Sequence, residues 1–369
     1  EMPLYVSQII LEVNYQDISS YKKAWEVILN KYEIFRTRFV FGKLEEDVQV
    51  VVEQSEFVWE DKDIKYNNLK KLAEEKRNLL LDDFPLTKFT LARTEKGTFL
   101  IWSFHHILLD GWSSSLVLEE VDKTYIRLTK KGLESELIEE DNSYSNFVLW
   151  KLSNLQNKDV SFWEKYLKGC NGFKFPTLTN GKRYDSFDET YINTDITVGK
   201  VEEYCRKNAV STATFFQTIF AVFLSLYTNQ KQVAFNVIDS GRTGGSFPNL
   251  DKVVGLLIDN SIRYYEIDEN NVFSTFLKSV QDKELRIKET NLYQSSVRSR
   301  VSIPNTNVTF VYENYPTSEQ NDRYRIISGI EMSSDDITFS VGASGESFDM
   351  KLMYSLDTIN HIQANEILK

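Results

Sequence analysis

The chain contains 369 residues, and its 43 basic and 54 acidic side chains give a formal net charge of −11 at pH 7. This acidic balance, with no basic block interleaved with aromatic residues, argues against binding to nucleic acid. No apolar run reaches the length of about 20 residues that spans a bilayer, and no signal peptide opens the chain. Two cysteines in so long a chain exclude a disulfide framework. We therefore expect a cytoplasmic protein without a membrane partner.

The first part of the chain alternates predicted strands and amphipathic helices. Strands are expected at residues 5–13, 35–41, 48–52 and 97–104, and helices at 19–31 and 67–80. A further helix is expected at 113–125, where Ser113 offers an N-cap and apolar residues recur at helical spacing. This mixture predicts an α/β fold.

Turn signals mark a boundary between two lobes. After a short amphipathic helix at 160–167, the chain carries two Asn-Gly pairs, at 171–172 and 180–181, and Pro176 between them. We therefore expect an N-terminal lobe at 1–169 and a C-terminal lobe at 170–369. In the second lobe a helix is expected at 211–227 and strands at 232–238, 307–312 and 337–341.

His105 and His106, two of only three histidines, stand side by side where the buried strand ends and before the next helix begins. Histidine exchanges protons near neutral pH because its unperturbed pKa is about 6.5, and loops between rigid elements often carry functional groups. An isolated histidine is more often structural, but an adjacent pair in a histidine-poor chain favours catalysis by His106. Zinc binding is not expected, because Cys170 and Cys205 lie far from the pair and from each other.

Two residues just after the pair complete the candidate site. Asp110, four residues after His106, either orients the imidazole or pairs with an arginine and braces the loop. Gly111 removes a side chain close to His106, which leaves room for a substrate or a backbone amide. The loop therefore combines a titratable group, an acid and a close-approach glycine.

The segment from His105 to Ser113 resembles the HHxxxDGWS core motif of nonribosomal peptide synthetase condensation domains, in the chloramphenicol acetyltransferase-like superfamily. Further segments resemble that family's motifs in the same order: 33–39 (RHExLRTxF), 144–150 (YxDYAxW), 240–242 (SGR), 254–263 (VGxFxNTxxxR) and 311–316 (FVxENYP). Lys31 and Tyr32 replace the Arg-His of the second motif, and Ser261 replaces a threonine. The family's first motif has no counterpart, so we interpret the chain as a portion of a longer protein.

The resemblance implies a fold and a reaction. The fold is a V-shaped pseudo-dimer of two lobes, each a β-sheet with flanking helices, with the active site at their junction. The reaction forms a peptide bond by attack of an acceptor amine on a donor thioester. Both substrates would arrive on phosphopantetheine arms of peptidyl carrier domains, beside an adenylation domain, so no cofactor or metal is expected on the chain itself.

The resemblance also assigns catalytic and supporting roles. His106 is the general base or a positioning group, and the backbone N–H of Gly111 is a candidate donor to the developing oxyanion. His105 is expected to be structural, because neighbours on an extended chain point to opposite sides. Asp110 is expected to pair with an arginine; the matched motifs offer Arg36, Arg242 and Arg263, of which Arg263 is favoured.

Three more residues are expected along the substrate or pantetheine tunnel. Asn314 is the polar group of the second lobe placed nearest the reaction centre, with a turn asparagine as the alternative. Trp112 has core packing as its alternative. Ser113 is a helix cap whose hydroxyl could also reach the pantetheine arm.

Other functions of this superfamily stay as alternatives. Against a stand-alone acyltransferase, the DFGWG motif of the plant members is absent and the SGR-like and ENYP segments favour the carrier-dependent branch. A non-catalytic recruitment module is disfavoured by the intact histidines. Epimerases favour DGVSWR after the histidines, and heterocyclization domains carry aspartates in place of the histidines. The sequence resembles condensation domains that take a D-configured donor slightly more than those that take an L-donor, and it does not identify the amino acids joined.

Overall fold

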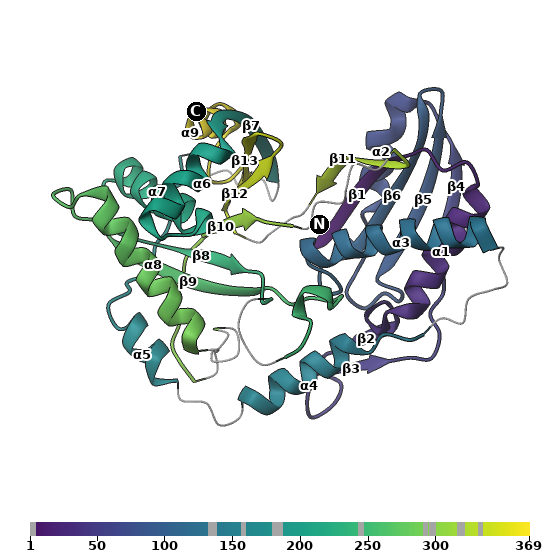
Figure 1. Ribbon diagram of the computed structural model, residues 1–369, viewed down its shortest axis with the longest axis horizontal. Helices are drawn as coiled ribbons and strands as arrows, with labels where there is room; N and C mark the ends of the chain where they lie inside the picture. Colours follow the sequence, from purple (N-terminus) through teal and green to yellow (C-terminus); the bar gives the residue numbers. More distant parts are fainter. Residues whose placement is uncertain are drawn as a thin grey trace.

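The computed structural model describes residues 5–131, 139–155, 160–178, 187–242, 247–290, 294, 300–315, 322–330 and 335–369. Two β-sheets organise them into two lobes that lie side by side (Figure 1). The expected mixed α/β, two-lobed architecture is therefore confirmed.

The first lobe is built on a five-stranded sheet with the order β11-β1-β6-β5-β4. Its strands are β1 (Val6–Val13), β4 (Trp59–Asp63), β5 (Thr87–Thr94), β6 (Gly97–His105) and β11 (Tyr324–Ile330). Helices α1 (Ile18–Lys31) and α3 (Gly111–Lys131) pack on one face, and α2 (Leu69–Lys76) packs on the other. Beside them lie the turn η1 (Glu33–Arg36), the hairpin β2 (Thr37–Val40) with β3 (Val48–Val51), the turn η2 (Tyr66–Asn68) and α4 (Ser143–Leu155).

The second lobe is built on a six-stranded sheet with the order β7-β13-β12-β10-β8-β9. Its strands are β7 (Phe187–Thr197), β8 (Gln232–Asp239), β9 (Asp259–Glu266), β10 (Val308–Glu313), β12 (Ile337–Ser344) and β13 (Ser347–Ser355). Its helices are α5 (Ser161–Leu167), α6 (Val198–Asn208), α7 (Thr212–Thr228), α8 (Phe273–Thr290) and α9 (His361–Leu368). Apolar side chains of α7 and α8 share one core with the sheet, which fixes the helices on it.

Most predicted elements agree with the structure, and two differ. The strand predicted at 35–41 begins as the 3₁₀ turn η1, and only β2 is extended. Ile34 and Phe35 are both buried, with exposed fractions of 0% and 2%, whereas a strand would point such neighbours to opposite faces. The helix predicted at 67–80 is shorter and runs over α2 alone.

Two segments of the second part of the chain pack with the first lobe. Strand β11 pairs antiparallel with β1, with Val13 opposite Tyr324. Residues 250–257 contribute Leu250 and Leu257 to the core that holds α1 and α3. We keep 1–169 and 170–369 as a proposed division, with these two segments reaching across it.

In the described part of the chain, no single helix has the length and apolarity needed to cross a membrane. Helices α6 and α7, which meet at an angle of 94°, pass that test only when they are taken together, by length and composition.

Candidate active site

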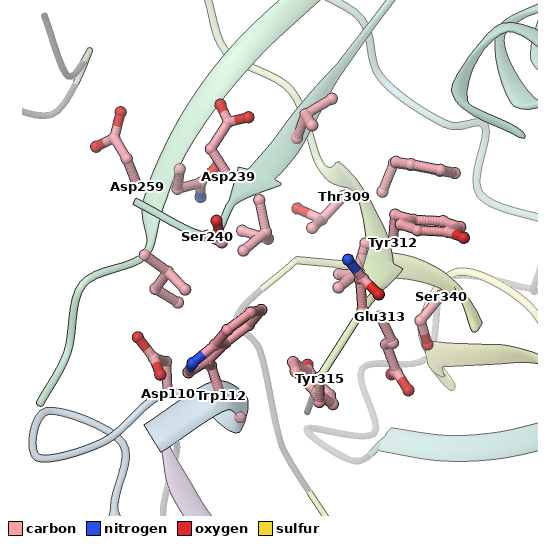
Figure 2. A pocket seen from close by; sticks show the side chains of 18 of the residues that line it. Asp110, Trp112, Asp239, Ser240, Asp259, Thr309, Tyr312, Glu313, Tyr315 and Ser340 are labelled. Carbon is pink, nitrogen blue, oxygen red and sulfur yellow. The ribbon is translucent and has the colours of Figure 1, made fainter. Parts of the chain in front are cut away.

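A cavity of 860 Å³ is lined by residues of both lobes. The first lobe contributes the loop from His105 to Trp112, and the second lobe contributes the ends of β8 and β10 (Figure 2). His106 and Asn314, which lie far apart in the sequence, therefore line the same space.

The histidine pair lies where β6 ends. The His105 N–H donates to the Leu86 carbonyl (2.9 Å), as in the sheet, and the His106 N–H donates to the Tyr5 carbonyl (2.7 Å). The Leu108 N–H then donates back to the His105 carbonyl (3.0 Å), which turns the chain away from the sheet. This turn holds the pair at the mouth of the cavity.

The two histidines have different surroundings. His105 is 8% exposed, and its Nδ1 accepts a hydrogen bond from the Ile107 N–H (3.1 Å). Burial, and secondarily the neighbouring His106, lowers the pKa of His105 to about 4. His105 is therefore neutral at pH 7 and locked by its own loop, whereas His106 is half-buried in the cavity wall.

Asp110 pairs with Arg242, so the expectation that favoured Arg263 is wrong. Arg242 Nη1 donates to Asp110 Oδ2 (2.8 Å), and both side chains are at most 2% exposed. The same oxygen accepts from the Leu257 N–H (2.9 Å), and Oδ1 accepts from the Ser113 N–H (2.8 Å). Asp110 therefore caps α3 and joins the two lobes with one carboxylate.

Arg263 and Arg36 lie away from Asp110. Arg263 forms ion pairs with Asp239 and Glu284 inside the second lobe. Arg36 donates to the carbonyls of Val52 and Glu53 and pairs with Glu140 (3.4 Å), and it is not part of the cavity wall. Arg36 is therefore not the partner of Asp110, and its support of the site stays a prediction.

Ser113 is neither a helix cap nor a tunnel residue, because α3 already begins at Gly111 and the Ser113 side chain is fully buried. Its hydroxyl donates to the Gly255 carbonyl (2.7 Å) and accepts from the Gly255 N–H (3.0 Å) and from Arg242 Nη2 (2.7 Å). Ser113 therefore belongs to the junction that Asp110 forms between the lobes.

Trp112 lies in the cavity wall and not in the core. Its indole N–H donates to the Asp251 carbonyl (2.9 Å), and the Arg242 guanidinium lies 5.5 Å from its ring centroid. Figure 2 shows the ring projecting from the start of α3 toward the cavity. The bond to Asp251 fixes this ring relative to the second lobe.

Gly111 makes room for Tyr315 of the second lobe. A Cβ atom at Gly111 would lie 2.4 Å from Cζ of Tyr315, far closer than real contacts allow. The side chain of Tyr315 thus approaches Gly111 closely. Tyr315 lines the cavity and was not singled out from the sequence, although it stands in the motif at 311–316 that resembles FVxENYP.

The residues that the structure describes contain no group of three or more His, Cys, Asp or Glu side chains able to hold a metal ion. Cys170 and Cys205 are buried free thiols, and burial raises the pKa of each.

Comparison with known proteins decides the family. A family model for the condensation domain matches residues 3–367. The chain belongs to this family. The condensation domain is 25% identical over 398 residues to bacitracin synthase 3 of Bacillus licheniformis, covering 98% of this chain but only 6% of that protein.

Solved structures show the same fold. The epimerization domain from the third module of tyrocidine synthetase B matches with a TM-score of 0.79 at 14% identity, covering 99% of this condensation domain and 89% of that chain. The first condensation domain of the CDA synthetase matches with a TM-score of 0.75 at 14% identity, covering 98% and 88%. At this identity the likeness establishes the fold alone.

Proposed function

We propose that this condensation domain forms a peptide bond within a nonribosomal peptide synthetase in the cytoplasm. The acceptor amine attacks the donor thioester carbon, so that a C–N bond forms, the C–S bond breaks, and the amine proton passes to the departing thiolate. The observation that carries the proposal is that one cavity is lined by His106 from the first lobe and by Asn314 from the second. Two reactants can therefore meet beside the histidine.

His106 is the residue that we assign to the amine. A thioester is already activated, so the domain must align the amine, keep it neutral and exclude water. Alignment of two tethered reactants contributes on the order of 7 kcal/mol, and a positioned base adds about 10²- to 10⁴-fold in rate. Both histidines line the cavity, but His105 is neutral and its Nδ1 is used by its own loop, so we assign the amine to His106.

The Gly111 N–H is the proposed oxyanion donor. It belongs to the first residue of α3, so no carbonyl of that helix accepts from it. Among the described residues, no backbone carbonyl outside the helix accepts from it either. A fixed N–H stabilises developing charge without reorganisation.

The proposed substrates are delivered by partners. Donor and acceptor peptidyl carrier domains would present phosphopantetheine thioesters, with an adenylation domain adjoining, and the condensation domain itself would hold no cofactor. The peptide synthetases to which the chain is similar are far longer than this chain, which supports a role as one domain of several. Asn314 and Trp112 would line the path of the arms.

The test is an assay with carriers loaded with donor and acceptor, read by intact mass spectrometry of the acceptor carrier. We expect a dipeptidyl carrier from the parent domain and at least about tenfold slower formation from His106→Ala. Lys96→Ala, an exposed turn residue outside the cavity, is the matched control and should react at the parent rate. Equal rates for His106→Ala and the parent would remove His106 from the mechanism.

A further inference from the structure

Helices α7 and α8 and strand β8 contribute a wall of the cavity that is built around Arg263. The Arg263 side chain is 1% exposed; its Nε donates to Glu284 Oε1 (2.9 Å) and its Nη2 donates to Asp239 Oδ2 (2.9 Å). Two carboxylates thus surround one guanidinium, which leaves the network with an excess of one negative charge. Both carboxylates line the cavity, and Arg263 lies behind them.

Three oxygens of this wall have no hydrogen-bond donor within the part of the chain that the structure describes. Gln217 uses its Nε2 to donate to Glu284 Oε1 (2.8 Å) and to the Tyr265 hydroxyl. Gln217 Oε1, Glu284 Oε2 and Asp239 Oδ1 accept no hydrogen bond from any residue that the structure describes. Gln217 is 3% and Glu284 is 6% exposed, and both line the cavity. These oxygens are available to accept hydrogen bonds from a ligand with N–H groups.

The charges around the cavity favour a cation. Its wall holds seven acidic residues, Asp110, Asp239, Asp251, Asp259, Glu284, Glu313 and Asp335, and three basic ones, Arg242, Lys288 and Lys351. Arg242 is used by Asp110, and Lys351 lies near Glu189 (3.8 Å). Lys288 follows Glu284 by one turn of α8, yet no described carboxylate lies within ion-pair distance of its ammonium.

We propose that the wall formed by Gln217, Asp239 and Glu284 binds a cationic side chain, an alkylammonium of the ornithine or lysine kind, on one of the two amino acids that are joined. An ammonium group has three N–H donors and no acceptor, which matches three oxygens that lack donors. Hydrogen bonds to charged groups are the stronger ones, and the partial burial of this wall strengthens them further. The inference rests on the proposed function, because it names the substrate class of the same cavity.

Binding is measured first, without catalysis. Pantetheine amides of ornithine, citrulline and norvaline differ only in the end of the side chain, so their dissociation constants by calorimetry isolate its charge. We expect the ornithine amide to bind at least about tenfold more tightly than the other two, as one charge-assisted hydrogen bond provides. Equal affinities for the three amides would overturn the inference.

Substitutions then test whether the preference for the ornithine amide arises at this wall. Glu284→Gln keeps the shape but removes the charge, and Asp239→Asn changes the partly exposed member of the wall. Each should reduce the ornithine preference to less than about threefold. Glu266, an exposed residue of β9 outside the cavity, provides the control, and Glu266→Gln should retain the preference. If Glu284→Gln fails to fold because its pair with Arg263 is weakened, the Asp239→Asn variant and the affinities of the parent domain for the three amides still test the inference.

The loaded-carrier assay separates the two proposals. Rapid product formation with ornithine and norvaline alike would retain the proposed function and overturn the cationic substrate class. A tenfold ornithine preference in binding, with no dipeptide from any loaded pair, would retain the cation site and overturn the proposed function.

Discussion

Asp110 accepts a 2.8 Å hydrogen bond from Arg242, which lies 132 residues further along the chain. The pair is buried, and each partner also bonds to the segment around residues 253–257. The loop that carries His106 is thus held by a charge of the opposite lobe.

Removal of Asp110 should destabilise the domain. Asp110→Ala leaves the Arg242 charge buried without its partner, which costs about 3 to 5 kcal/mol in the free energy of unfolding. Urea unfolding would measure this loss. Asp61→Ala, which breaks an exposed pair with Arg93, is the control and should cost no more than about 1 kcal/mol. An Asp110→Ala domain with unchanged stability and no activity would assign Asp110 a direct catalytic role.

Gly111→Ala should displace Tyr315. The new Cβ would collide with the ring, and such overpacking costs about 1 to 3 kcal/mol. In a Tyr315→Ala background the same substitution should cost much less, because the obstructing ring is gone. A double-mutant cycle by thermal unfolding would measure this coupling; additive effects would show that the Gly111–Tyr315 contact is not the reason for the glycine.

Acid should destabilise the domain through His105. Its pKa in the folded state is about 4, below the ordinary value of 6.5, so the unfolded state binds the proton more readily. Stability from this group is complete above about pH 6.5, falls as the pH is lowered, and levels off below about pH 4, for a total of about 3 kcal/mol. His105→Asn should show a correspondingly flatter pH dependence. Proton NMR should show the His105 ring titrating near 4; titration near 6.5 would contradict the burial argument.

Tethering should govern the rate. A donor thioester on a small thiol lacks the arm that makes the encounter intramolecular, so with a carrier-bound acceptor it should react at least about 10²-fold more slowly than a carrier-bound donor at equal concentration. Stopped reactions analysed by mass spectrometry would compare the two donors. Equal consumption would favour a stand-alone acyltransferase.

Local features of the site could be predicted from the sequence, and long-range pairings could not. The strand before His105 and the following helix have clear periodicity, and the contrast between two adjacent histidines follows from strand alternation. The choice among Arg36, Arg242 and Arg263 depends on where the segment around residue 242 returns to the first lobe, which no local pattern encodes. The same is true of Tyr315, whose position opposite Gly111 is set by β10 of the other sheet.

The pairing of β11, from the second part of the chain, with β1 of the first lobe limits how such domains can be recombined. A chimera cut at residues 169 and 170 would take its edge strand, its residues 250–257 and the guanidinium for Asp110 from a foreign parent. Compatible hybrids should therefore transplant Arg242, residues 250–257 and residues 324–330 together with the first lobe, so that each of these segments keeps the packing partners of its own parent.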